Sequence, residues 1–460
     1  MIHFDHDDDK PREECGVFGI YGNNEASLYT ALPSERHMGL VGDHFGGDLR
    51  TRLPGYAAIG HNRYSTQGRP MLRNIQPIFA DLSFGGFAVA HNGNLTNSRK
   101  LRHQLVRDGA IFQSTMDTEV ILHLVARSSK PRFLDRLVDA LQQIEGGYAL
   151  VGLTGKKLIG ARDPIGLRPL VIGKLGTAYV LASETCALDI IGAEFVREVE
   201  NGEMVVITDD GIESIRAFPP RASSPCVFEY VYFARPDSIV QGRSIYEVRR
   251  RMGHRLAAET PADADVVVPV PDSGVPAALG YSEASGIPFG MGIIRNHYVG
   301  RTFIQPTNVG RQAAISKKHS PNRPVLEGKR VILVDDSIVR GNTSKKIVQM
   351  VREAGAKEIH LRSASPPIVN PDFYGIDMAA KSELFAAIHT HEEMVRELKV
   401  DSLGFLSVPG LYAAIGEPVR NAMQPQFADH CFTGDYPTSL VDHQHDESDK
   451  ERQLSLLDDT

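Results

Sequence analysis

Cysteine is scarce in this sequence. The 460 residues include four cysteines, all far apart and none in a CxxC pair: Cys15, Cys186, Cys226 and Cys431. This spacing gives no zinc signature and is typical of a protein in a reducing compartment. No apolar run is long enough to span a bilayer, and the N-terminus is acidic where a signal peptide is basic. We therefore expect a cytoplasmic protein that is not bound to a membrane.

The motifs of two large nucleotide-binding classes are also absent. The chain contains neither the GxxxxGK[ST] of P-loop proteins nor the GxGxxG of dinucleotide-binding folds. Its net charge of -7 argues against extensive binding to nucleic acid or to an anionic membrane. Apolar residues make up 42% of the chain and charged residues 23%, the composition of a globular protein large enough for two domains.

A Pro- and Ser-rich break, AFPPRASSP at residues 217–225, divides the chain into two parts. In the first domain, which we place at residues 15–225, short β-like runs alternate with glycine-rich turns, as in layered sheets. In the second, at residues 226–437, apolar strands precede turns and helical patterns, which predicts a parallel α/β sheet. We expect residues 1–14 to be a leader and residues 438–460 a polar tail.

The most informative stretch is VILVDDSIVRGNTS, which begins at Val331. Its apolar residues predict a buried parallel strand, so Asp335 and Asp336 follow at the carboxyl end, where open α/β sheets bind ligands. Adjacent acids hold a divalent cation or a vicinal diol, and the helix N-terminus at Thr343 and Ser344 suits an anion. Diol and anion together describe a ribose 5-phosphate. The alternative is an ordinary turn with exposed acids and Thr343 as a helix cap.

This stretch resembles the phosphoribosyl-diphosphate (PRPP) motif of type I phosphoribosyltransferases. The resemblance implies that the acid pair contacts the ribose hydroxyls and that the turn cradles the 5-phosphate. The residues implied in the turn are Ser337, Arg340, Gly341, Asn342, Thr343 and Ser344.

Two further segments extend this resemblance. VPVPDSGVPAA at 268–278 is similar to the companion loop that lies near the pyrophosphate, and NHYVGRTFIQPT at 296–307 is similar to the mobile lid. The companion loop implies Asp272, Ser273 and Gly274 as PRPP ligands, and the lid implies Arg301, although a solvated loop arginine is the alternative for Arg301. The family also implies one Mg2+ per subunit, held by Ser273, Asp335 and Asp336.

The N-terminal half suggests where the nucleophile that attacks PRPP would come from. Cys15 stands where the globular pattern begins, and a thiol at a new N-terminus has its own α-amine as a base. Arg63 suits a carboxylate, Asn92 and the Gly93 N–H suit an oxyanion, and Asp117 suits an ammonium group. Together these groups match the parts of a glutamine substrate. The alternatives are a buried strand cysteine, a surface arginine, an Asn-Gly hairpin turn and a capping arrangement of Ser114 with Asp117.

These motifs resemble glutamine amidotransferases of the N-terminal-nucleophile class, which implies an αββα-layered domain and a leader cut before Cys15. Both resemblances together imply a glutamine-dependent phosphoribosyltransferase. It would hydrolyse glutamine at Cys15 and transfer the ammonia to PRPP, giving 5-phosphoribosylamine, pyrophosphate and glutamate in the first step of de novo purine synthesis. The family further implies inhibition by purine nucleotides and a homo-oligomer, a tetramer or a dimer.

The sequence departs from the family pattern in two places. Some relatives ligate a [4Fe–4S] cluster with four cysteines. Here only Cys226 falls at a ligand position, Asp372 occupies another, and Cys431 does not align, so we expect no cluster. A family segment that helps wall the glutamine pocket is missing near residues 32–34. The alternatives are therefore an enzyme that uses ammonia only, or a catalytically dead protein that binds PRPP or nucleotides.

Two other hypotheses are weaker. HTHEEMVREL at residues 389–398 contains clustered histidines and acids that suggest a metal site. Thr390 and Glu393, however, fit a capping box ahead of the apolar Met394 and Leu398, so we expect an ordinary helix start. An amidotransferase that delivers ammonia to another acceptor, such as a sugar phosphate, is disfavoured by the PRPP motif.

Overall fold

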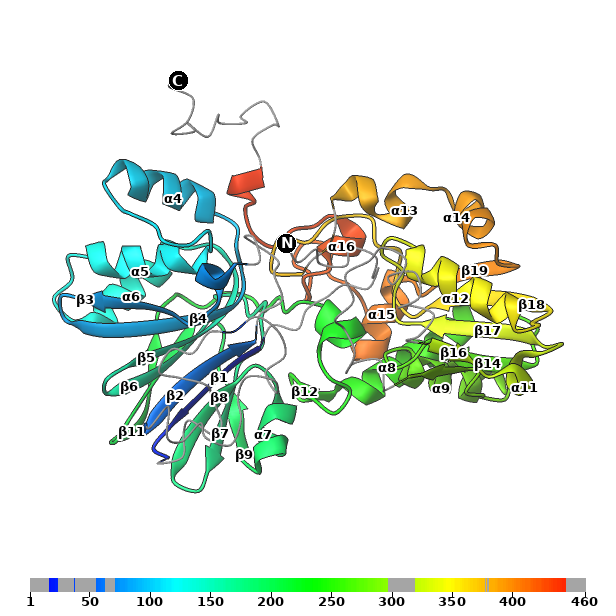
Figure 1. Ribbon diagram of the computed structural model, residues 1–460, viewed down its shortest axis with the longest axis horizontal. Helices are drawn as coiled ribbons and strands as arrows, with labels where there is room; N and C mark the ends of the chain where they lie inside the picture. The colour runs from blue at the N-terminus through cyan, green and yellow to red at the C-terminus, as the bar shows by residue number, and fades with distance from the viewer. Residues whose placement is uncertain are drawn as a thin grey trace.

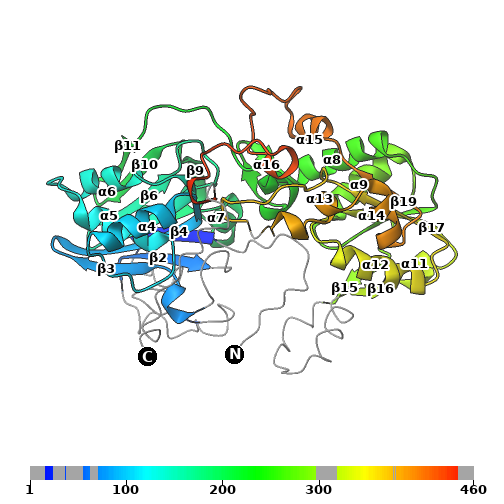
Figure 2. The ribbon, with the colours of Figure 1, turned by 90° about the horizontal axis from the view of Figure 1, so that it is seen from above.

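The computed structural model describes residues 16–23, 37, 55–62, 71–296, 319–376, 378 and 380–443 of the chain. These residues form two lobes that lie side by side in both views (Figures 1 and 2). Both lobes combine sheets with helices, and the C-terminal lobe is built around a parallel sheet. The predicted α/β class is therefore confirmed.

Two antiparallel sheets form the centre of the N-terminal lobe (Figure 1). One has the strand order β2-β1-β8-β7-β9 and the other has the order β11-β10-β6-β5-β4-β3. The first sheet consists of β1 (Gly16–Tyr21), β2 (Ala57–Asn62), β7 (Val171–Leu175), β8 (Ala178–Ala182) and β9 (Glu194–Glu198). The second consists of β3 (Ile78–Leu82), β4 (Gly85–Leu95), β5 (Gly146–Thr154), β6 (Lys157–Arg162), β10 (Glu203–Thr208) and β11 (Gly211–Arg216).

Helices cover the outer faces of these two sheets, and strand β5 shows why. Its residues Ala149 and Val151 join the core between the sheets, whereas Tyr148 and Leu150 join the core under the helices. Alternate residues on a strand face opposite ways, so a strand buried on both sides is apolar throughout. The covering helices are α4 (Ser98–Arg107), α5 (Thr118–Arg127) and α6 (Phe133–Leu141) on the second sheet and α7 (Thr185–Ile191) on the first. This is the expected αββα arrangement.

The C-terminal lobe has a four-stranded parallel sheet in the order β14-β17-β18-β19. Its strands are β14 (Val266–Pro269), β17 (Arg330–Asp335), β18 (Glu358–Ser363) and β19 (Ser402–Phe405). One face packs against α8 (Ile245–Glu259), α9 (Val275–Ser285) and α15 (Val408–Ile415), and the other against α12 (Asn342–Glu353) and α14 (His391–Leu398). In β17, Val331 and Leu333 belong to one core and Ile332 and Val334 to the other, which explains its apolar sequence.

Shorter elements complete the described chain. They are β12 (Ile239–Val240), β13 (Arg243–Ser244), β15 (Ile293–Arg295), β16 (His319–Pro321), α11 (Arg323–Leu326), α13 (Phe385–Ile388), α16 (His430–Thr433), the π-helix η2 (Glu229–Phe233) and the 3-10 helices η1 (Leu72–Asn74), η4 (Lys381–Glu383) and η5 (Val441–His443). Within the described ranges, every helix is too short or too polar to cross a bilayer.

Hydrogen bonds join β4 and α4 to segments from the C-terminal part of the chain. The side-chain amide of Asn94 in β4 donates to the Phe373 carbonyl oxygen at 2.9 Å. The Asp442 carboxylate in η5 accepts from the backbone N–H groups of Arg99 and Lys100 at 2.7 and 3.0 Å. An acid at the first turn of α4 also has a favourable interaction with the helix dipole. Segments far apart in sequence therefore meet at strand β4 and helix α4.

Helices α8 and α9 cross at two glycines, and this contact supports the loop that follows β14. A Cβ on Gly253 would overlap the Ala277 carbonyl oxygen, and a Cβ on Gly280 would overlap the Arg250 carbonyl oxygen. The two backbones therefore touch, and neither position has room for a methyl group. Because α9 begins directly after Gly274, the spacing of this helix pair fixes where the loop ends.

We predict that Gly253→Ala destabilises the C-terminal lobe by about 1–3 kcal/mol, because the added methyl group forces the helices apart. For a lobe of this size, each kcal/mol lowers the melting temperature by roughly 2–4 °C. Thermal unfolding followed by circular dichroism measures the change. Gly155→Ala is the matched control, since a Cβ there has nothing within 4 Å. Equal melting temperatures for both variants would show that the helix contact is not as tight as described.

Candidate active site

The two loops predicted to bind PRPP lie side by side at the carboxyl edge of the parallel sheet. Strand β14 pairs with β17 in parallel, and Pro269 lies opposite Val334. The loop after β14 holds Asp272, Ser273 and Gly274, and the loop after β17 begins with Asp336. The structure thus brings together two segments that are separated by more than fifty residues in the sequence.

The carboxylates of Asp335 and Asp336 are buried, each residue being 2% exposed. Ser337 Oγ donates to Asp336 Oδ1 at 2.7 Å, and Ser273 Oγ donates to Asp336 Oδ2. Asp335 Oδ1 accepts from the backbone N–H of Asp336 at 2.9 Å. Hydroxyl groups therefore satisfy Asp336 from both loops, and the acids are not merely exposed turn residues.

Glycines set the shape of both loops. A Cβ on Gly274 would lie 2.5 Å from the Val334 carbonyl oxygen, so this position has no room for a larger residue. Gly341 is the N-cap of α12 with φ +81°, a left-handed conformation that favours glycine. The helix therefore begins at Asn342, and Thr343 lies in its first turn rather than at the cap. Thr343 and Ser344 are both buried there.

Arginines at this edge were not all anticipated. Arg340 forms an ion pair with Glu383 at 3.2 Å, and Asp272 forms one with Arg295, a residue that sequence reasoning missed. Arg249 was also missed: its buried guanidinium donates to the carbonyl oxygens of Tyr230 and Ala234 at 2.9 and 2.8 Å. Burial lowers the pKa of Arg249 to about 10, opposed chiefly by the charge of Asp336. Arg249 is thus a buried cation behind the acid pair.

Asn92 and Gly93 lie inside strand β4, so the hairpin-turn alternative is wrong. They pair with Ala149 and Tyr148 of β5. Gly93 has φ +135°, and a Cβ on it would overlap the Gly147 carbonyl oxygen. Only glycine fits this position, because both the conformation and the space exclude a side chain. A strand therefore carries the pair predicted to bind an oxyanion.

Two side chains hold the Asn92 amide. Its Nδ2 donates to Ser183 Oγ at 3.4 Å, and its Oδ1 accepts from Arg168 Nη2 at 3.3 Å. Ser183 Oγ also accepts from the backbone N–H of Val17 at 2.9 Å, at the start of β1. The Ser183 hydroxyl thus links Asn92 to the strand that begins one residue after Cys15.

Arg168 also reaches the second lobe. It forms an ion pair with Glu229 at 3.4 Å, and the two side chains are 3% and 4% exposed. Glu229 begins the π-helix η2, an element often found at functional sites. Burial raises the pKa of Glu229, with the charge of Arg168 opposing. Sequence reasoning missed both members of this buried pair.

Asp117 is itself the N-cap of α5, so the alternative with Ser114 as the cap is wrong, and Asp117 also binds β4. Its Oδ1 accepts from the Thr118 N–H at 2.9 Å, and its Oδ2 accepts from the Leu95 N–H at 3.0 Å. His91 Nδ1 lies 3.5 Å from Oδ2, and burial lowers the pKa of His91, so that its ring is neutral. Asp117 also lines a cavity of about 150 Å³ beside Arg99 and Arg102.

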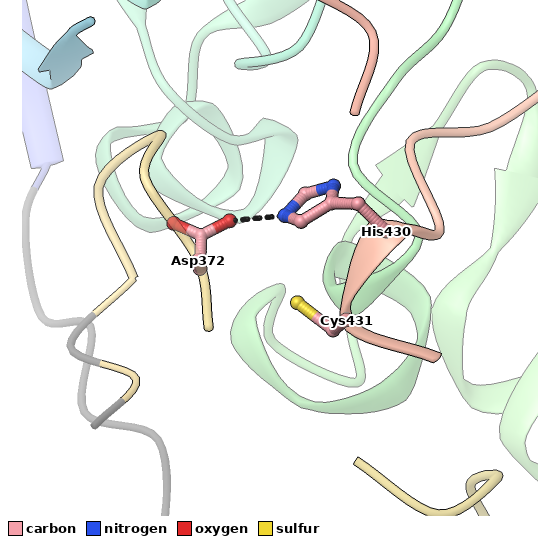
Figure 3. A group of neighbouring side chains, drawn as sticks. All are labelled: Asp372, His430 and Cys431. Atoms are coloured by element: carbon pink, nitrogen blue, oxygen red, sulfur yellow. Dashed lines mark hydrogen bonds and ion pairs between the residues drawn. The ribbon is translucent and has the colours of Figure 1, made fainter. Parts of the chain in front are cut away.

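A third group of buried side chains gathers near the junction of the lobes (Figure 3). Donor atoms of Asp372, His430 and Cys431 lie within 4.8 Å of one another, and Cys226 is the next thiol in the same core. Cys431 therefore lies beside Asp372 in the fold, although it does not align with a cluster ligand in the sequence. Two thiols, a carboxylate and an imidazole do not match the four thiolates of a [4Fe–4S] cluster.

Some predictions lie outside the described residues, namely those for Cys15, Arg63 and Arg301 and for the segment near residues 32–34.

The capping box predicted at Thr390 and Glu393 is confirmed. Thr390 accepts from the Glu393 N–H, and the Glu393 side chain accepts from the Thr390 N–H. The histidines of that segment therefore start a helix, as expected.

Comparison with known proteins identifies both halves. Residues 61–189 match a glutamine amidotransferase domain, and residues 237–363 match a phosphoribosyl transferase domain. An amidophosphoribosyltransferase from Rhizobium etli is 56% identical over 466 aligned positions, which cover 95% of this chain and 94% of the relative. The Bacillus subtilis amidophosphoribosyltransferase is 46% identical over 452 positions, covering 93% and 95%.

Solved structures of similar proteins lead to the same family. Glutamine PRPP amidotransferase from B. subtilis, complexed with ADP and GMP, superimposes with a TM-score of 0.85 at 45% identity, over 93% of this chain and 98% of the other. A structure described as the allosteric regulatory enzyme of purine biosynthesis gives a TM-score of 0.86 at 44% identity, over 93% and 97%. The chain belongs to the amidophosphoribosyltransferase family and is an enzyme, a glutamine-dependent phosphoribosyltransferase.

Proposed function

We propose that this chain hydrolyses glutamine at Cys15 and transfers the ammonia to PRPP, forming 5-phosphoribosylamine, pyrophosphate and glutamate. The observation that carries the proposal is the buried acid pair at the end of β17, whose second member accepts hydroxyl hydrogens from both loops. A vicinal diol offers the same kind of donor as these serine hydroxyls. The ribose of PRPP would therefore exchange with groups that already satisfy the site.

The turn after the acids supports binding of the 5-phosphate. Gly341 ends the turn, and the positive end of the α12 helix dipole at its N-terminus suits an anion. In the proposal, Ser337 and Arg340 through Ser344 surround the phosphate, and Asp272, Ser273 and Gly274 lie at the pyrophosphate. Arg301 would neutralise the leaving group.

Magnesium fits the donors that are present. Ser273 and Asp336 offer oxygen atoms that already touch, and Asp335 adds a neighbouring carboxylate. Oxygen ligands of this kind suit Mg2+, which keeps several waters and binds through one or two carboxylates and a substrate phosphate. Bound there, the ion would neutralise charge on the departing pyrophosphate.

The glutaminase half rests on the linked positions of Asn92 and β1. Cys15 would attack the side-chain amide of glutamine, with its own α-amine as the base. The Asn92 Nδ2 and the Gly93 N–H would stabilise the oxyanion, while Arg168 holds Asn92 Oδ1. Arg63 and Asp117 would bind the carboxylate and the ammonium group of glutamine. This role requires removal of residues 1–14.

The relatives favour this reading over the alternatives. They resemble the chain in both halves, which supports a glutamine-dependent enzyme rather than one limited to ammonia or a dead binding protein. The alignment with the R. etli protein spans 466 positions although this chain has 460 residues, so it contains gaps in this chain. That observation supports a missing segment, which we propose lies near residues 32–34.

Regulation by purine nucleotides is the remaining part of the proposal. It is supported by the B. subtilis structure, which was solved with ADP and GMP. The homo-oligomer stays a prediction.

We predict different effects for two substitutions, one in each half. Cys15→Ala should abolish glutamine-dependent release of pyrophosphate from PRPP and leave ammonium-dependent release within about twofold, because ammonia bypasses the thiol. Asp335→Asn should lower both by about 100-fold or more, because the charge that holds the sugar is lost. Pyrophosphate release, measured with each nitrogen donor, gives the comparison. Equal loss of the ammonium reaction in both variants would contradict the division of labour.

We further predict that Arg168→Met lowers glutamine-dependent kcat by about 10- to 100-fold and changes the KM for glutamine little, since the Asn92 amide loses its orienting donor. The ammonium-dependent reaction should be nearly unchanged. Arg216→Met is the matched control, because Arg216 pairs with Glu200 in the same lobe on an exposed surface. If Arg168→Met reduces both reactions equally, the residue acts only through stability.

A further inference from the structure

Asp372, His430 and Cys431 form a buried group that the proposed reaction does not use. A carboxylate oxygen, an imidazole nitrogen and the thiol sulfur lie within 4.8 Å of one another. His430 Nε2 is hydrogen-bonded to Asp372 Oδ2 at 2.8 Å, and neither side chain has exposed surface. Figure 3 shows the Cys431 sulfur pointing toward the same space as this pair. All three are ligand types that bind transition metals.

Cys226 is a further thiol in the same core, outside the group of donor atoms that lie within 4.8 Å of one another. Its backbone forms a parallel bridge with Ala428, three residues before Cys431, and both cysteines belong to one apolar core. Two buried thiols and a buried carboxylate therefore lie together in this part of the fold.

The surroundings fix the orientation of these donors. Asp372 Oδ1 accepts from the N–H groups of Tyr374 and Ile376 at 2.8 and 2.9 Å, so Oδ2 is left for His430. The His430 ring packs against the rings of Tyr374 and Tyr436, with centroids 5.1 and 4.9 Å away. Its Nδ1 has no hydrogen-bond partner within the described chain, so polar contact holds the ring only at its Nε2 edge.

We propose that Asp372, His430, Cys431 and Cys226 bind one divalent cation of the zinc class. Two sulfurs, a nitrogen and an oxygen are ligands that tetrahedral zinc takes in proteins, whereas magnesium requires oxygen. On binding, each thiol releases its proton to solvent and its sulfur bonds to the metal. The imidazole binds through Nε2 as a neutral base, so its hydrogen bond to Asp372 Oδ2 is broken and its proton moves from Nε2 to Nδ1.

The site would tie three segments together at the junction of the lobes. Cys226 lies just after the Pro-rich break, Asp372 follows β18, and His430 and Cys431 begin α16. The turn that Asp372 caps carries Gly375, and a Cβ on Gly375 would lie 2.9 Å from Gly93 Cα. A metal at Asp372 therefore holds the turn that packs against the strand bearing Asn92.

Cobalt(II) is the probe that tests the site, because its spectrum reports the ligands. The purified full-length chain is treated with a chelator and titrated with Co2+. We expect one Co2+ per chain, a thiolate-to-cobalt charge-transfer band in the near ultraviolet and the visible bands of tetrahedral cobalt. Zn2+ should abolish both sets of bands, and excess Mg2+ should not.

Variants separate this site from other thiols. Cys431→Ser and Cys226→Ser should each weaken the charge-transfer band, and the double variant should lose it. Cys186→Ser removes another buried thiol outside the group and should leave the band unchanged, as should Cys15→Ala. The absence of a band in the wild-type chain overturns the proposal, whether or not the variants fold. A band that survives the double variant, or that disappears in either control, overturns it as well.

Discussion

Direct contact between glycine backbones joins the two lobes at the glutaminase strand. A Cβ on Gly93 would overlap Gly147 in the neighbouring strand, and a Cβ on Gly375 would lie 2.9 Å from Gly93. Such close approach is open only to residues without side chains. Gly375 belongs to the C-terminal lobe, so the position of one half determines where the backbone of the other can lie. The Asp372 carboxylate, which accepts from two N–H groups of that turn, keeps Gly375 in place.

Buried charges run beside this contact, between the two predicted substrate sites. Arg168 touches Asn92 and pairs with Glu229, and Arg249 packs against the carbonyl groups of the π-helix that Glu229 begins. Asp336 is near enough for its charge to raise the pKa of Arg249 against burial. Charges in a low-dielectric interior act over longer distances than on a surface, and loss of one leaves its partner uncompensated. The two halves therefore share one electrostatic environment rather than two.

Much of this arrangement could be predicted from the sequence, because local patterns specify local structure. The apolar run ending in Asp335 and Asp336 indicates a strand with acids at its carboxyl end. The Thr390–Glu393 spacing likewise indicates a helix start. Asn92 and Gly93 were harder, since an Asn-Gly pair is typical of a hairpin and only the partner strand makes it a strand position. Arg249 follows Val248 on the buried, mostly apolar face of α8. A charged residue on such a face is only a weak sign of a buried functional group. The group of Asp372, His430 and Cys431 could not be foreseen, because tertiary packing alone brings residues 372 and 430 together.

The burial of the acid pair has a consequence for substrate affinity. Asp336 already accepts hydroxyl hydrogens from Ser273 and Ser337, so a sugar diol replaces hydrogen bonds of the same kind. Such an exchange is nearly neutral in free energy, since each bond gained follows one that is lost. Affinity must then come from the anionic ends of the ligand, at the N-terminus of α12 and near Asp272, where charge-assisted bonds are stronger. The acid pair thus determines which sugar fits and how it is oriented, and the phosphate groups determine how tightly it binds.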